Sequence, residues 1–148
     1  ERTLMKLILS LATVLGLMLV TETVFAHTAP DDLAARCVVK VDQTIDRCES
    51  AAADETAECL QQIRRLLADG QEQAARRVAA DCIDSATERA EKCAKYIKRL
   101  CNACIDQLVN LGATQLARRM NQVCEDAISD IRLILQREKN TIQNAFDS

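Results

Sequence analysis

The chain has 148 residues, enough for one domain, and its 19 basic and 22 acidic residues give a net charge of −3. Charge of mixed sign argues against a surface for nucleic-acid backbones or anionic lipid, because both require clustered Lys and Arg. Only 2% of the residues are aromatic, so the chain also lacks the stacking platforms that single-stranded nucleic acids use. We therefore expect no nucleic-acid partner and no membrane association of the mature chain.

Residues 1–26 are typical of a secretion signal. Lys6 precedes an apolar run from Leu7 to Val20, and Val24-Phe25-Ala26 has the form of a signal-peptidase site. The apolar run is short for a helix that crosses a bilayer about 30 Å thick, so we expect a cleaved signal and not a membrane anchor. Cleavage before His27 would leave residues 27–148 as a single domain that is extracellular, or periplasmic in a bacterium.

Helix breakers are few in the mature segment. Thr28-Ala-Pro-Asp31 has the form of a capping box with Pro in the first turn, which predicts a helix start near residue 30. Glycine accepts the left-handed conformation found just past helix ends, so Gly70 and Gly112 predict the ends of two helices. Good helix formers fill the stretches between these residues. The resulting helices are expected over about 30–69, 71–110 and 113–146.

Each predicted helix has one apolar face, because its apolar residues recur at helical spacing and its charged residues fall elsewhere. Amphipathic helices joined by tight turns form antiparallel bundles. The predicted fold class is all-α, an elongated antiparallel three-helix bundle. Helices over these ranges are about 51 to 60 Å long at 1.5 Å per residue, so the bundle is a rod. We expect the third helix to fray or to contact a partner chain beyond Glu138.

All eight cysteines follow residue 26, and an even number of cysteines in a secreted chain indicates a disulfide framework. On each of the first two helices, cysteines recur every eleven residues, which is three helical turns within about 20°. In an antiparallel hairpin, residues at one level have a constant sum of residue numbers. That sum is 141 for three pairs: Cys37–Cys104, Cys48–Cys93 and Cys59–Cys82. The centre falls between Gly70 and Gln71, where the glycine independently predicts a turn.

The two remaining cysteines follow the same rule. The sum for Cys101 and Cys124 places the centre of a second turn beside Gly112. Cys101 precedes Cys104 by three residues, which is about 60° around the helix and equals the angle between neighbours in a triangular bundle. A disulfide between Cys101 and Cys124 is therefore expected to join the long hairpin to the third helix.

This layout resembles the twin-cysteine helical hairpins of the coiled-coil-helix class, in which two C-x9-C helices are tied antiparallel. The present chain has ten residues between its cysteines, three disulfides across the hairpin instead of two, and a third helix. It also has a secretion signal in place of that class's mitochondrial setting. The resemblance is architectural, and it implies no function.

Several residues suggest chemistry, but a structural interpretation is favoured for each. His27 could chelate copper at a mature N-terminus, yet the chain has no second histidine. Cys101-Asn-Ala-Cys104 has redox C-x-x-C spacing, yet it lies within a helix and both thiols have predicted partners elsewhere. If the chain were reduced, its thiolates could bind Cu(I) or Zn(II), but adjacent cysteines of a stripe lie about 16.5 Å apart.

No catalytic, metal or cofactor site is predicted. The acidic pairs Asp54-Glu55 and Glu125-Asp126 are more often solvated helix surface than acid and base catalysts. The sequence contains no glycine-rich phosphate loop, nucleophile elbow or HExxH motif. We therefore expect a protein that is not an enzyme.

Two functional interpretations remain open. We prefer a secreted structural or protein-interaction protein, a rigid rod that acts on an unknown protein partner or by self-association. The alternative is a carrier of a lipid or another apolar small molecule between the helices. Its groove would lie beneath the third helix, at Leu100, Leu108, Leu116, Met120 and Ile131. Thiolate metal binding by the reduced chain is a third alternative.

Overall fold

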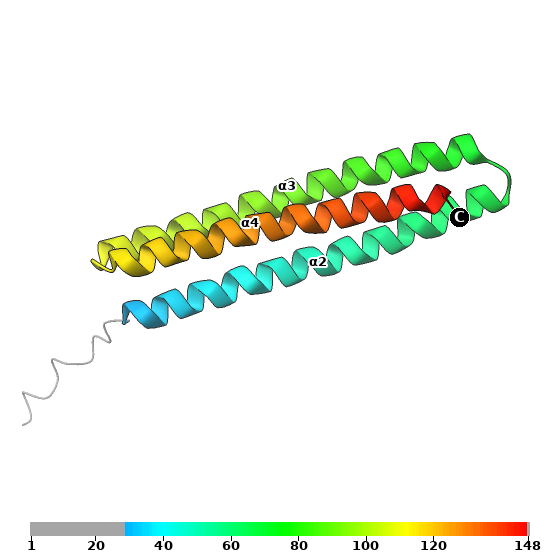
Figure 1. Ribbon diagram of the computed structural model, residues 1–148. Helices are drawn as coiled ribbons and strands as arrows, with labels where there is room; N and C mark the ends of the chain where they lie inside the picture. The colour runs from blue at the N-terminus through cyan, green and yellow to red at the C-terminus, as the bar shows by residue number, and fades with distance from the viewer. Residues whose placement is uncertain (1–28, 148) are drawn as a thin grey trace, which may run out of the picture.

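The computed structural model describes residues 29–147, so the expected secretion signal and His27 lie outside the described residues. Three long helices lie side by side as a rod, each antiparallel to the one before it in the chain (Figure 1). They are followed by one turn of 3₁₀ helix, and the elements are α2 (Pro30–Ala68), α3 (Glu72–Asn110), α4 (Thr114–Gln143) and η1 (Asn144–Phe146). With 39 residues each, α2 and α3 are about 58 Å long. The predicted all-α, antiparallel three-helix bundle is confirmed.

Helix α2 begins at Pro30. Its N-cap residue is Ala29, and no side chain from residue 29 onwards bonds to the backbone N–H groups of the first turn. The predicted helix start near residue 30 is confirmed, whereas the predicted capping box depends on Thr28, which lies outside the described residues. Pro30 accounts for the helix start, because its fixed φ suits the first turn and it has no N–H to satisfy. Asp31 and Asp32 add favourable charge at the positive end of the helix dipole.

Two glycines end α2 and α3, as predicted. Gly70 has a φ of 69° and Gly112 a φ of 72°. After α2, the Gly70 N–H donates to the carbonyl of Leu67 (3.0 Å), and the Gln71 N–H donates to that of Leu66 (2.8 Å). The same two bonds recur after α3, so both turns are Schellman motifs that satisfy the last helical carbonyls. The tight turns place successive helices antiparallel.

The C-terminal part of the chain is packed. Helix α4 continues past Glu138 to Gln143, and η1 follows it. Ile142 is 1% exposed and belongs to a buried cluster beside the α2–α3 turn. The guanidinium of Arg76 lies 5.0 Å from the ring centre of Phe146. The expectation that this segment frays is therefore wrong, because apolar burial and a cation–π contact hold its end.

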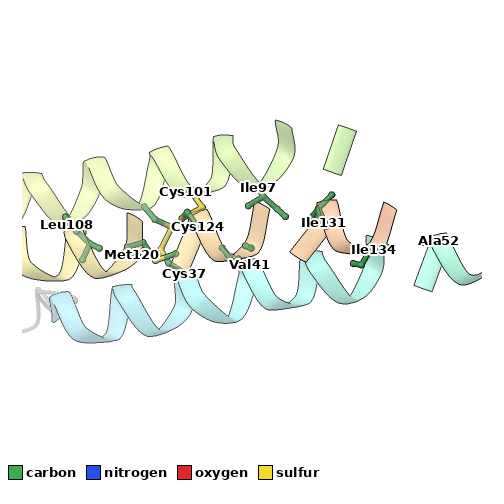
Figure 2. Packing of buried hydrophobic residues seen from close by; sticks show 13 residues of the cluster. Cys37, Val41, Ala52, Ile97, Cys101, Leu108, Met120, Cys124, Ile131 and Ile134 are labelled. Carbon is green, nitrogen blue, oxygen red and sulfur yellow. A yellow bond between two sulfur atoms is a disulfide. The ribbon is translucent and has the colours of Figure 1, made fainter. Parts of the chain in front are cut away.

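The buried apolar side chains form two clusters along the rod. The larger cluster includes Val41, Ile97 and Leu108 and extends from the start of α2 to the middle of the rod (Figure 2). The smaller cluster surrounds Ile63 and Ile142 near the α2–α3 turn. Close approach of the helices is possible because many buried residues are small: Ala52, Ala75, Ala79, Ala86, Ala117 and Ala127. The core is consequently long and thin.

Gly70→Ala is expected to lower the free energy of unfolding by about 1 kcal/mol, because an L side chain is strained at this positive φ. An added Cβ would meet no atom within 4 Å, so backbone strain and not a clash causes the loss. Gly70→Asn is the matched control and should lose less, since Asn visits the left-handed region more readily. Urea unfolding of the oxidised proteins measures both changes. An Ala variant as stable as the wild type would contradict the assigned turn.

Candidate functional site

Four disulfides connect the helices at successive levels of the rod. Three of them join α2 to α3, with Cα–Cα distances of 6.2, 6.4 and 6.3 Å: Cys37–Cys104, Cys48–Cys93 and Cys59–Cys82. We call these three the disulfide ladder. The fourth, Cys101–Cys124, joins α3 to α4 at 6.1 Å (Figure 2). These are the four pairs expected from the cysteine spacing, and the distances fall in the usual range of about 4.4 to 6.8 Å.

The C-x-x-C cysteines bond to different helices. Cys104 is joined to α2 and Cys101 to α4, as their angular offset requires. A redox dithiol or a thiolate metal site needs free thiols, whereas every cysteine of this structure is in a disulfide. Within residues 29–147, no three His, Cys, Asp or Glu side chains are grouped for a metal ion. Four disulfides favour an oxidising compartment.

None of the helices between residues 29 and 147 is long and apolar enough to span a membrane. Their charged residues recur throughout each helix, opposite the face that packs in the bundle.

A polar junction lies between the two apolar clusters. We define it as Thr56 of α2, Arg89 of α3 and Glu138 of α4, with Glu55 at its edge. The Arg89 guanidinium donates to the carboxylates of Glu138 and Glu55. The Thr56 hydroxyl donates to Glu138 Oε1 at 3.1 Å. Glu138 is only 7% exposed, so the junction joins all three helices through a buried charge.

The polar junction contributes to the register of α4 more than to net stability. Desolvation of buried Glu138 and partly buried Arg89 offsets much of their attraction, although removal of one partner is costly. Ile134 and Ile142 lie one helical turn before and after Glu138. A one-turn shift of α4 would therefore place isoleucine beside the Arg89 guanidinium and would leave Glu55, at the exposed edge of the junction, as its carboxylate partner. No buried side-chain nitrogen or oxygen of the described residues lacks a hydrogen-bond partner in the present register.

The sequence holds a signal for the junction that composition alone does not reveal. Glu138 falls on the same helical stripe as Ile131, Ile134 and Ile142, and a lone acid on an apolar stripe indicates a buried partner.

The acidic pairs Asp54-Glu55 and Glu125-Asp126 lie at the solvent surface. Asp54, Glu125 and Asp126 are exposed, and the last two each accept a hydrogen bond of 2.9 Å from an amide side chain one turn earlier. The pKa of Glu88, also exposed, is lowered by a hydrogen bond from Lys92 and by the charge of that side chain. Such pairs one turn apart stabilise single helices.

The five residues of the expected ligand groove lie in or against the larger apolar cluster. Leu108, Met120 and Ile131 are 0%, 2% and 3% exposed (Figure 2). Leu100 and Leu116 are partly buried and pack against the same cluster. A ligand beneath α4 would therefore have to displace core side chains.

A different groove lies between α2 and α3, at the end of the rod where α2 begins. It has a volume of about 700 Å³, and the Cys37–Cys104 disulfide lines it. Leu100 also lines it, the only residue of the expected set to do so, and the charged lining residues are Arg36 and Lys40. Among the described residues, α4 contributes none to the lining. We call it the α2–α3 groove.

No protein-family model matches the chain, and no curated protein and no solved structure matches it. The fold and its sites define an antiparallel three-helix rod held by four disulfides. The features from which a function can be argued are the disulfide ladder, the polar junction and the α2–α3 groove.

Arg89→Met is expected to lower the free energy of unfolding by about 3 kcal/mol, because it leaves Glu138 buried without its cationic partner. Combining Arg89→Met with Glu138→Leu should restore most of this loss, since an apolar pair requires no desolvation of charge. Urea unfolding of the oxidised variants measures the difference.

Lys92→Met is the matched control for that comparison. The side chains of Lys92 and Glu88 are 73% and 68% exposed, so the loss of their ion pair should change stability by less than about 0.5 kcal/mol. Equal losses in Arg89→Met and in the double variant would show that the pair is not buried as assigned.

Proposed function

We propose that this protein is a secreted, non-enzymatic rod that binds another protein along its helical surface. The disulfide ladder carries the proposal, because it fixes α2 against α3 at three levels over about 33 Å of helix. The fourth disulfide fixes α4 to the same hairpin. The backbone positions on such a surface keep one arrangement, so a partner has to order side chains but not the helices that carry them.

Secretion is supported by two features. Disulfides persist in oxidising compartments and are rare in the cytosol, and this chain has four. The basic residue, apolar run and small residues within 1–26 have the order of a secretion signal. Both favour an extracellular rod, or a periplasmic one in a bacterium.

A protein partner is supported by the large apolar side chains that remain at the surface. These residues are each at least half exposed: Val39, Tyr96, Val109, Leu111 and Leu133. They lie on α2, α3, α4 and the turn after α3, where a partner can reach them. Tyr96 is a residue type that is enriched at protein interfaces. The partner is therefore expected to bury one or more of these side chains.

Site-specific photo-crosslinking tests the proposal. A photoreactive residue in place of Tyr96, Val109 or Leu133 of the oxidised protein should capture a protein in the medium of the cells that produce it. The same residue in place of exposed Lys98 is the matched control and should capture less. Mass spectrometry then tells a second copy of this chain from a different protein. Failure of all apolar positions to exceed the control would contradict the proposed interaction.

A further inference from the structure

We propose that the α2–α3 groove binds the carboxylate of a medium- or long-chain fatty acid. The site goes beyond the proposed protein interaction and does not depend on it. It also differs in place from a groove beneath α4, because its lining comes from α2, α3 and the following turn. Three properties support the inference: the shape of the groove, its apolar walls and its charge.

The shape suits an extended chain. The groove has a volume of about 700 Å³, which falls within the range of about 300 to 1,000 Å³ for small-molecule sites. Its lining reaches from Leu100 to Leu111, a length of about 16 Å along the helix. The Cys37–Cys104 disulfide lies at its base, since these cysteines are 3% and 7% exposed. A covalent bond between the two walls keeps the groove from opening or closing.

The walls offer apolar surface to a hydrocarbon chain. Leu33 of α2 and Leu100 and Ala103 of α3 line the groove, and Leu111 lines its outer end. Leu111 is 50% exposed, although burial of a leucine side chain away from water is favourable in free energy. An alkyl chain in the groove would cover these side chains without moving the core.

The charge of the groove specifies the head group. Arg36 and Lys40 are the charged lining residues, they lie one helical turn apart, and no Asp or Glu belongs to the lining. Neither side chain forms a salt bridge with any residue between 29 and 147. Arg36 Nε donates to the backbone carbonyl of Asp32 at 3.3 Å, which leaves the terminal amino groups of the guanidinium for a ligand. A guanidinium with a neighbouring ammonium favours a carboxylate.

The combination of these properties favours a small amphiphile over a peptide. An α-helix with its side chains is about 10 to 12 Å across, so a helical peptide of the groove's length would extend well outside its volume. A fatty acid places one charge at Arg36 and Lys40 and its chain along the leucines. A fatty acid therefore fits the observed volume and charge together.

Isothermal titration calorimetry of the oxidised protein with dodecanoate tests the site. The dodecanoate concentration is kept below the critical micelle concentration. We expect one site with a dissociation constant in the micromolar range. Dodecyltrimethylammonium has the same chain with the opposite charge and should bind at least about tenfold more weakly. Arg36→Gln combined with Lys40→Gln should weaken dodecanoate binding by about tenfold or more. Leu111→Ser, at an exposed turn position, should weaken it several-fold.

Lys95→Gln combined with Lys98→Gln is the matched control. It removes the same net charge from exposed positions outside the groove and should leave dodecanoate binding unchanged. Far-ultraviolet circular dichroism verifies that every variant is folded. Equal weakening by both double variants, equal binding of both amphiphiles, or no binding of dodecanoate by the wild type would overturn the site. Binding of an acidic helical peptide but not of dodecanoate would also overturn the proposed fatty-acid site. None of these outcomes affects the crosslinking test of the protein interaction.

Discussion

Disulfide bonds at intervals of eleven residues constrain this molecule more than any other interaction. Eleven residues bring a helix back to nearly the same face, so the three bonds of the ladder lie on one side of α2 and one side of α3. A thin rod buries a smaller share of its surface than a sphere does, and the alanine-rich interface adds little apolar area. Each bond stabilises the fold by about 2 to 4 kcal/mol, because it lowers the conformational entropy of the unfolded chain. The effects of nested bonds are less than additive. The disulfide bonds thus provide stability that the small buried apolar area of the core does not.

Helix α4 is held by different chemistry at its two ends. Near its start, Cys124 is bonded to α3 in the larger apolar cluster. Near its end, Glu138 accepts hydrogen bonds from Arg89 and Thr56, and Ile142 packs beside the α2–α3 turn. The disulfide sets one level of α4 relative to α3, while the polar junction sets the level relative to both other helices. The rod therefore has a defined register along its whole length, which a surface that binds a partner requires.

Some of these features follow from the sequence, and others do not. The pairings of cysteines such as Cys48, and the turns at Gly70 and Gly112, follow because helical periodicity and glycine conformation are local properties of the chain. The packed end beyond Glu138 does not, since it depends on contacts that local preference does not determine. The partners of Glu138 and the place of the groove depend on the orientation of each helix about its own axis relative to its neighbours. Such orientation is decided by the packing of many side chains at once.

The disulfide pattern of the purified protein is the most direct test of this account. Proteolysis without reduction, with thiols blocked beforehand and peptides identified by mass spectrometry, reports which cysteines are joined. We expect Cys48 to be joined only to Cys93, and the other bonds to be Cys37–Cys104, Cys59–Cys82 and Cys101–Cys124. Free thiols, or a bond between Cys48 and any other cysteine, would contradict the antiparallel rod.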